Sequence, residues 1–349
     1  MRMNTRGVWL ALLAAALFGA STPLAKALLT ENSPQLLAGL LYLGSGTGLL
    51  VVWLIRRGGR QEASLSRNDL PWLAGAVTFG GVIGPLLLMC GLLRTPASSA
   101  SLLLNLEAVF TSVLAWLLFR EHVSVRIALG MLAIVAGGAL LSWEDQISWR
   151  TAWGPLAIAT ACFCWAIDNN LTQKVSAADP MQIAQLKGLV AGIVNISLAF
   201  SLGAQLPAPL PATGALLVGF LGYGLSLVCF VLALRQLGTA RTGAYFSLAP
   251  FIGATLSLIL YREQLTWPFL SAAALMALGL WLHLTERHEH WHEHELLEHS
   301  HAHVHDEHHR HEHSPENPPE EPHIHVHRHE RLRHAHPHYP DIHHRHPHR

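Results

Sequence analysis

The chain has 349 residues, of which 51% are hydrophobic and 13% charged, and its formal net charge is zero. Soluble globular proteins carry about 25% charged residues, so the composition argues against that class and indicates that lipid surrounds most of the chain. The zero net charge hides a division, because residues 1–285 carry sixteen basic and ten acidic side chains, whereas residues 286–349 carry seven basic and thirteen acidic ones.

The hydrophobic pattern predicts an all-α integral membrane protein with ten transmembrane helices. A helix needs about 20 mostly apolar residues to cross a hydrocarbon core about 30 Å thick, and turn-rich or charged stretches separate ten such segments. The predicted spans are residues 8–29, 35–55, 70–92, 97–119, 125–142, 152–173, 182–203, 213–234, 240–261 and 266–284.

The distribution of positive charge predicts the orientation. Lys and Arg are retained on the cytoplasmic side of a membrane. With the N-terminus inside, that side holds eleven basic side chains outside or at the ends of the spans, and the opposite side holds three. Ten spans return the chain to the side where it started, so we expect both termini, including the tail after residue 285, to be cytoplasmic.

The first and second halves of the chain repeat one another. NLEAVFTSVLAWLLFREHVS, which begins at Asn105, aligns without gaps with SLAPFIGATLSLILYREQLT, which begins at Ser247, and Arg120-Glu121 then matches Arg262-Glu263. We therefore predict five helices in residues 7–142, five in residues 151–285 and a separate tail in residues 286–349. Because five is odd, the two repeats would cross the membrane in opposite senses, which is a transporter architecture with a solute site near the midplane.

The two halves resemble paired EamA domains of the drug/metabolite transporter superfamily. Repeats of that family typically end a helix with an apolar run and a Gly-Glu or similar acidic step before the last span. Here that position reads LLFREHVS and LILYREQLT, with Arg in place of the usual Gly, and the second half keeps the family's proline in SLAPFIGA whereas the first has LEAVFTSV. The resemblance covers residues 7 to 285 and implies a ten-helix secondary transporter or exporter in the inner membrane, with relatives that export amino acids, metabolites, sugars and drugs.

Two carboxylates inside predicted spans are the strongest candidates for a solute site. A charged group in the middle of a span costs at least about 2.5 kcal/mol, so it needs a partner or a function. Asp168 would bind a solute amine, a cation or a proton, and Glu107 would either assist it or brace the bundle. The alternative is that Asp168 simply pairs with Lys187 or Lys26, which also lie near enough to span ends to reach the interface. The predicted substrate-binding residues are Asp168, Asn169, Asn170, Trp165, Thr172, Glu107 and Asn105.

The tail holds 23 of the 25 histidines and has almost no large apolar residues. Such a composition cannot bury enough surface to offset the loss of chain entropy, so we expect the tail to be disordered. Repeated His-x-His steps are a metal-binding composition, and neutral imidazole suits Zn, Ni, Co and Cu. With a pKa near 6.5, such binding should weaken below about pH 6. The predicted metal ligands are His288, His290, His292, His294, His299, His301, His303, His305, His308, His309, His311, His313, His323, His325, His327 and His329.

Three function classes follow, none of them enzymatic. The first is a secondary transporter of small organic solutes that requires no cofactor, with a tail that binds divalent metals. The second is a divalent metal-ion transporter whose tail loads the ion, and the third is a membrane-anchored metal buffer without transport. The chain has no G-x-x-x-x-G-K-[ST] sequence for ATP. The expected partners are the lipid bilayer, a small solute, metal ions and a second copy of the chain as a homodimer, but no nucleic acid.

Overall fold

The computed structural model describes most of the chain. The described residues are 5–30, 32–55, 65–119, 124–142, 149–175, 179–205, 207–237, 239–285, 289–293, 297–303, 323–329 and 333–337.

The described part of the first half is helical. Its helices are α1 (Thr5–Leu28), α2 (Pro34–Ile55), the 3-10 turn η1 (Arg67–Asp69), α3 (Leu70–Ala76), the π-helical segment η2 (Val77–Ile83), α4 (Gly84–Leu92), α5 (Ala97–Leu103), α6 (Leu106–Phe119) and α7 (Val125–Leu141).

The second half follows the same plan. Its helices are α8 (Trp149–Lys174), α9 (Pro180–Ser201), α10 (Pro209–Gly219), the π-helical segment η3 (Phe220–Leu225), α11 (Ser226–Leu237), α12 (Thr239–Phe246), α13 (Ala249–Tyr261) and α14 (Trp267–Leu284).

Eight helical segments of the described residues are long and apolar enough to cross a membrane. Two predicted spans fall short of that description: α7 is apolar but has 17 residues, and α8 has 26 residues but carries the polar sequence around Asp168. Every predicted span coincides with helix, and the number of ten crossings stays a prediction.

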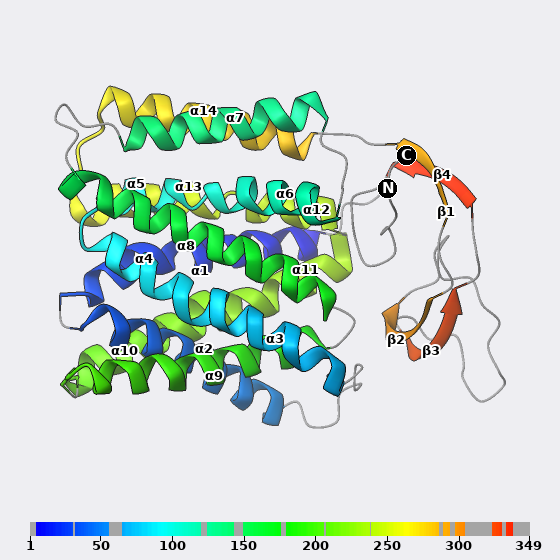
Figure 1. Cartoon of the computed structure of the whole chain (residues 1–349), viewed down its shortest axis with the longest axis horizontal. Coiled ribbons are helices and arrows are strands. Elements are labelled where there is room, and N and C mark those ends of the chain that lie inside the picture. Colours follow the sequence, from blue (N-terminus) through cyan, green and yellow to red (C-terminus); the bar gives the residue numbers. More distant parts are fainter. Residues whose placement is uncertain are drawn as a thin grey trace.

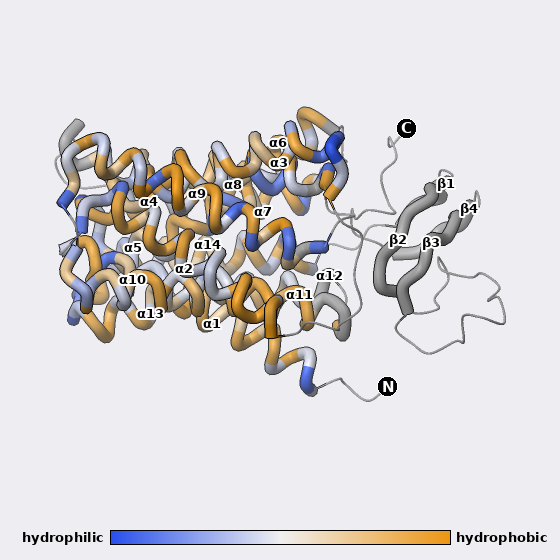
Figure 2. The backbone as a smooth tube through the Cα atoms, turned by 90° about the horizontal axis from the view of Figure 1, so that it is seen from below, coloured by the Kyte–Doolittle hydropathy of each residue, from blue (hydrophilic) through white to orange (hydrophobic). Residues whose placement is uncertain are grey.

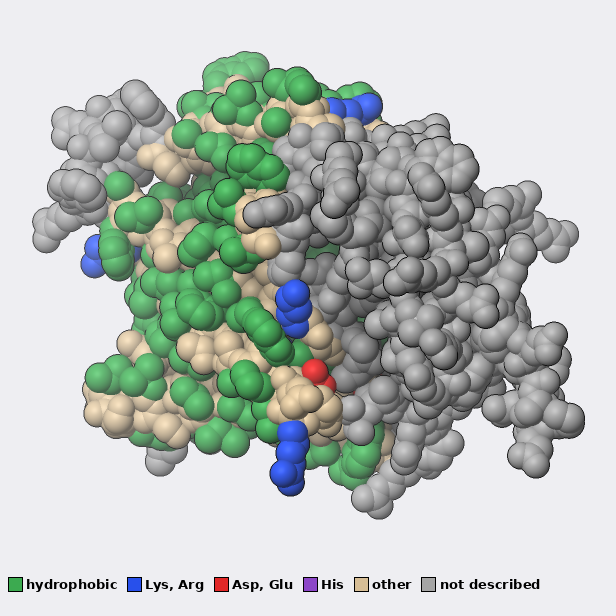
Figure 3. Space-filling model, turned by 45° about the vertical axis from the view of Figure 1, so that its right-hand side comes forward, with side chains coloured by type: hydrophobic (Ala, Val, Ile, Leu, Met, Phe, Trp, Pro, Cys, Tyr) green, Lys and Arg blue, Asp and Glu red, His purple; other side chains and the backbone are tan. Residues whose placement is uncertain are grey.

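The helices lie side by side in a bundle along one long direction (Figure 1). Hydrophobic residues dominate along their length (Figure 2). On the face shown in Figure 3, only a few charged side chains interrupt the described hydrophobic surface. Large apolar side chains such as Leu129, Leu132 and Ile193 are more than half exposed. A bundle with this surface is suited to hydrocarbon as its solvent.

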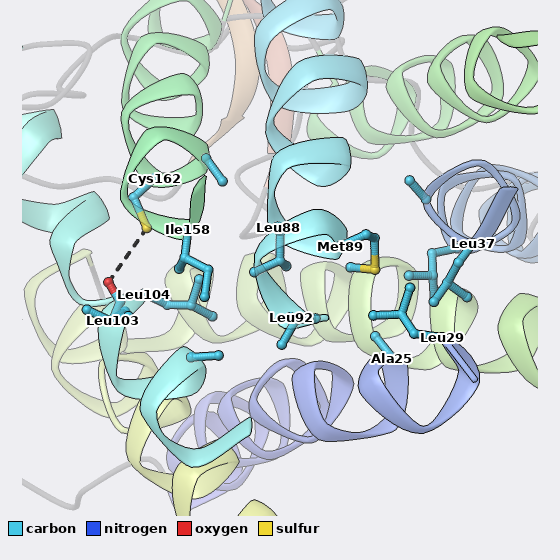
Figure 4. Close-up of a cluster of buried hydrophobic side chains, with 14 of the residues drawn as sticks. Ala25, Leu29, Leu37, Leu88, Met89, Leu92, Leu103, Leu104, Ile158 and Cys162 are labelled. Atoms are coloured by element: carbon cyan, nitrogen blue, oxygen red, sulfur yellow. Dashed lines mark hydrogen bonds between the residues drawn. The ribbon is translucent and has the colours of Figure 1, made fainter. Parts of the chain in front are cut away.

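The interior of the bundle is a leucine-rich core. Leu88, Met89 and Leu92 of α4 lie between Leu37 of α2 and Ile158 of α8, and all five are almost completely buried (Figure 4). This core ties the helices of the first half to α8 of the second half.

The four cysteines of the chain take part in no disulfide. Cys162 approaches the carbonyl of Leu103 at 3.6 Å, and Cys90, Cys164 and Cys229 are also free thiols. All four lie in helices of the bundle.

Close contacts between glycines place the two halves against each other. Gly46 of α2 and Gly188 of α9 occupy equivalent positions in the two aligned repeats and face one another, and a Cβ on Gly188 would lie 2.6 Å from the backbone nitrogen of Gly46. The contact of α1 with α11 has its counterpart in the contact of α8 with α4, and that of α1 with α13 in that of α8 with α6. Small residues permit this close approach of helices in lipid.

The described segments of the tail form strands, and the disorder of the tail as a whole stays a prediction. β1 (Glu289–Glu293) pairs antiparallel with β4 (Arg333–Pro337), and β2 (Leu297–His303) pairs antiparallel with β3 (His323–His329). Alternating His-x-His has the two-residue period of a strand.

Candidate functional site

The centre of the site is an ion pair between two helices of the second half. Nζ of Lys187 in α9 lies 2.6 Å from both carboxylate oxygens of Asp168 in α8, and the hydroxyl of Thr172 donates to Oδ1 of Asp168 at 2.9 Å. The side chains of Lys187 and Asp168 are 18% and 9% exposed. A buried ion pair of this kind needs such added hydrogen bonds to offset the cost of removing two charges from water.

The first half reaches the pair through Gly80 in the π-helical segment η2. A Cβ on Gly80 would overlap the carboxylate of Asp168, so a side chain at this position would displace that carboxylate. The carbonyl oxygen of Gly80 accepts hydrogen bonds from Tyr42 Oη at 2.6 Å and Trp165 Nε1 at 3.0 Å. Trp165 and Asp168 are one helical turn apart on α8, so both lie against the same segment of the first half.

A second carboxylate, that of Glu107, is bonded to Asn169, the residue after Asp168. The amide nitrogen of Asn169 donates to Oε1 of Glu107 at 2.8 Å and approaches Oγ1 of Thr111 at 3.4 Å. Glu107 stands in the first turn of α6, directly after the turn at Leu104 and Asn105 that separates α5 from α6. Of the two carboxylates that the sequence singled out, one therefore belongs to α8 and the other is bonded to the next residue of the same helix.

Two of the predicted residues do not join this group. Asn170 is buried and donates to the carbonyl of Ala166 one turn earlier in its own helix, at 2.8 Å. Asn105 donates to the carbonyl of Leu102 at 2.8 Å, and its amide lies 3.9 Å from the sulfur of Met276. Both amides satisfy backbone carbonyls, which is a structural role.

Lys187 is the main residue that the predicted set omits. Its position near the start of a span suggested a side chain that reaches the interface, but it lies two helical turns after Pro180. That depth is the sequence signal for a buried partner, and the pairing with Asp168 is the alternative that the sequence leaves open. Lys26, the other lysine considered, donates instead to the carbonyl of Thr95.

Three further residues could not be found from spacing. Tyr42, Gly80 and Asn195 resemble ordinary span residues in the sequence. Their roles depend on carbonyls of η2, since Asn195 donates to the carbonyl of Gly81 at 2.9 Å.

A carboxylate in the loop before α14 has a structural role. Glu263 accepts hydrogen bonds from the backbone nitrogens of Ala97 at 2.9 Å and Ser98 at 3.2 Å, and also from the hydroxyl of Ser98. A carboxylate at a helix N-terminus satisfies free N–H groups and favours the helix dipole. Glu263 thereby links the loop before α14 in the second half to α5 in the first.

The described side chains hold no group of three or more His, Cys, Asp or Glu arranged for a metal ion. Nine of the sixteen predicted histidine ligands lie in strands, and the register places His299 opposite His327, His301 opposite His325, and His303 opposite His323. Seven lie outside the described residues: His288, His294, His305, His308, His309, His311 and His313.

Two regions of the chain, residues 5–143 and 152–285, match the model of the EamA-like transporter family, and together they make up most of the chain. The chain belongs to the EamA-like transporter family. Each matched region corresponds to one half of the bundle, so this EamA protein brings its Asp168–Lys187 pair from the second region and the Gly80 carbonyl from the first.

Similar proteins agree with this assignment. An uncharacterized transporter of Methanothermobacter thermautotrophicus is 31% identical over 262 residues, which are 70% of this chain and 76% of the relative. The uncharacterized transporter YyaM of Bacillus subtilis is 23% identical over 270 residues, which are 73% of this chain and 86% of the relative.

A crystal structure of a protein described without a functional name shares the fold with the EamA protein. Its TM-score is 0.58 at 16% identity, and the match covers 81% of this chain and 96% of that chain. At this identity the likeness shows the fold alone. The EamA protein is a multi-pass membrane protein of a transporter family.

Proposed function

We propose that the protein is a secondary transporter of a small organic solute, and that the solute presents an amine or another cationic group to Asp168. The observation that carries the proposal is the buried pair of Asp168 and Lys187. An ionisable residue within the membrane is expensive and is retained for a function. Here the pair lies where both halves meet, because Gly80 of the first half packs on it.

The charges of the site favour a cation over an anion. Asp168 and Glu107 supply two carboxylates, and Lys187 supplies an ammonium group that contacts Asp168. With both carboxylates ionised, the local sum is one negative charge. When a solute ammonium binds at Asp168, Lys187 would turn toward Glu107, so that each carboxylate keeps one positive partner.

The proposed mechanism is alternating access between two inverted five-helix repeats that cross the membrane ten times. Rocking of one half against the other around a site at their interface is how such repeats work in secondary transporters. The plasma membrane as location, cytoplasmic termini and a homodimer belong to the same proposal. The distribution of positive charge supports this orientation.

The test measures flux of primary amines, amino acids and organic cations in vesicles that contain the purified full chain. We expect wild-type protein to move at least one cationic solute, and Asp168→Asn to lower its rate at least tenfold. Asp179→Asn is the matched control, because Asp179 caps α9 outside the site and asparagine is an equally good cap. Equal flux through both variants would contradict the assignment of Asp168.

A second candidate function is transport or buffering of divalent Zn, Ni, Co or Cu through the histidine tail. The density of His-x-His steps supports metal binding, and the β2–β3 register that sets histidines opposite each other adds to it. Cellular metal content should be compared for the full chain, a chain ending at Thr285 and Asp168→Asn. A change that needs both tail and Asp168 favours metal transport, and one that needs the tail alone favours a buffer.

A further inference from the structure

The two halves each contain one π-helical segment at the same place. In η2 the backbone N–H of Gly84 donates to the carbonyl of Phe79, and in η3 that of Ser226 donates to Leu221. Each bond reaches back by five positions, and the alignment that matches Arg120-Glu121 with Arg262-Glu263 also matches Gly84 with Ser226. Single-turn π segments inside α-helices are frequent at functional sites.

The first π segment leaves the carbonyl of Gly80 without a backbone donor. In an α-helix, Gly84 N–H would bond to Gly80, four residues earlier. In η2 that N–H donates instead to the carbonyl of Phe79. The residue five positions after Gly80 is Pro85, which has no N–H to give. Gly80 therefore depends on donors from outside its helix.

Two side chains from different helices supply those donors. Tyr42 of α2 and Trp165 of α8 both donate to the carbonyl of Gly80. If the segment changed to the α register, Gly84 would take over this carbonyl, and both side chains would lose their acceptor. The bonds from Tyr42 and Trp165 thus stabilise the π register specifically.

The register of η2 is coupled to the ion pair by direct contact. Removing one residue from a π turn rotates one side of the helix by about 100° and shifts it by about 1.5 Å relative to the other. Gly80 would then no longer be the residue against Asp168, and a neighbour such as Phe79 would carry a side chain into this space. The π register is therefore the one that leaves room for the bidentate contact between Asp168 and Lys187.

We propose that Tyr42 and Trp165 are positioning residues that clamp the Gly80 carbonyl, hold η2 in the π register and so keep Asp168 aligned with Lys187. Release of this clamp accompanies the change of access in transport. The clamp is a property of the chain itself, whereas its part in transport rests on the function proposed above.

The test of the clamp uses Pro85→Ala, which restores a backbone N–H that can reach Gly80 or Gly81. Thermal unfolding midpoints are measured for purified full chain in detergent, with and without the double change Tyr42→Phe and Trp165→Phe. We expect the double change to lower the midpoint by about 2 to 4 °C in the natural background, as loss of one or two hydrogen bonds to a buried carbonyl would. In the Pro85→Ala background the loss should be less than half as large.

Tyr223→Phe is the matched control. Tyr223 stands in η3 and its ring lies 5.6 Å from that of Tyr42, but it does not donate to Gly80. Its effect should be the same in both backgrounds. Equal losses for the Tyr42 and Trp165 double change in both backgrounds would overturn the clamp.

The transport arm separates the clamp from the proposed function. With a cationic solute that the wild type moves, Tyr42→Phe should change the maximal transport rate at least threefold and the half-saturating solute concentration less than twofold. Adding Pro85→Ala to Tyr42→Phe should restore the maximal rate. A change confined to half-saturation would overturn the role in transport. If wild type moves no cationic solute, the proposed function fails, whereas coupling in the unfolding midpoints still supports the clamp.

Discussion

The two halves of the bundle use the same contact with different chemistry. Gly80 in the first π segment packs on Asp168 of α8. Gly222, its equivalent in the second repeat, packs on Ser21 of α1, where a Cβ would lie 2.7 Å from that of Ser21. Lys187 also has an equivalent in the first repeat, and it is Ser45. One half thus carries an ion pair where the other carries two buried serines.

This difference shows that close helix packing and buried charge are separate features of the bundle. Close packing at the crossing requires a glycine in both halves, because the opposing helix leaves no room for a side chain. It does not require charge, since Ser21 donates to the carbonyl of Phe18 in its own helix and satisfies itself. The charges of Asp168 and Lys187 are therefore an addition to a packing plan that works without them.

The π segments differ in the same way. Pro85 has its counterpart in Leu227, which retains an N–H. The second segment can therefore complete its backbone hydrogen bonds in either register, whereas the first relies on Tyr42 and Trp165. The π segment that packs on the ion pair is also the one whose helix register is controlled by side chains.

The largest expected effect comes from breaking the ion pair on one side. Lys187→Met should lower the free energy of unfolding by about 3 kcal/mol, because it leaves the carboxylate of Asp168 buried without its partner. Denaturant unfolding in detergent micelles measures it. The double change Asp168→Asn with Lys187→Met should recover most of the loss, and Ser45→Ala should cost about 1 kcal/mol or less. A double variant as unstable as the single one would contradict this account.

A side chain at the glycine contact should affect the charged site more than the neutral one. Gly80→Ala should cost about 2 to 3 kcal/mol, since the new methyl group displaces the carboxylate of Asp168 from Lys187. Gly222→Ala should cost about 1 kcal/mol less, because Ser21 has no ion pair to lose. Unfolding of the two variants under identical conditions measures the difference, and the opposite order would show that the ion pair does not decide it.

The cap between the halves should contribute less. Glu263→Ala removes the acceptor of the two backbone N–H groups at Ala97 and Ser98, so the protein should lose about 1 to 2 kcal/mol of stability. Glu263→Gln keeps one oxygen acceptor and should recover part of it. Amide hydrogen exchange of α5 is the direct measurement, and unchanged protection there in Glu263→Ala would refute the cap.

The smallest effect is expected at Arg262. Its backbone has φ 51° and ψ 39°, the left-handed conformation that costs a residue with a Cβ about 1 kcal/mol or more. This is the position at which the EamA resemblance anticipates glycine. Arg262→Gly should therefore raise stability by up to about 1 kcal/mol, reduced by the greater freedom of glycine in the unfolded chain. Arg262→Ala serves as the control and should not stabilise, and equal midpoints for both variants would argue against backbone strain.

The positions of the helices could be predicted from the sequence because the cause is local. A helix in lipid satisfies its own backbone hydrogen bonds, so a run of about 20 apolar residues is enough to place it. The same reasoning singled out Asp168 and Glu107, since a carboxylate in such a run is rare. It did not reveal the strands of the tail, or that the amides of Asn105 and Asn170 bond to nearby backbone carbonyls.

The sequence by itself determined the helical class, the repetition of its halves and the two carboxylates, because composition and period along one segment are sufficient for these. Only the tertiary structure decided that Lys187 pairs with Asp168, that Gly80 leaves room for the pair and that Tyr42 and Trp165 hold the Gly80 carbonyl. Each of these contacts joins residues from different helices. Which of the many polar and small residues meet is set by how helices pack against each other, and that packing has no signature within any single helix.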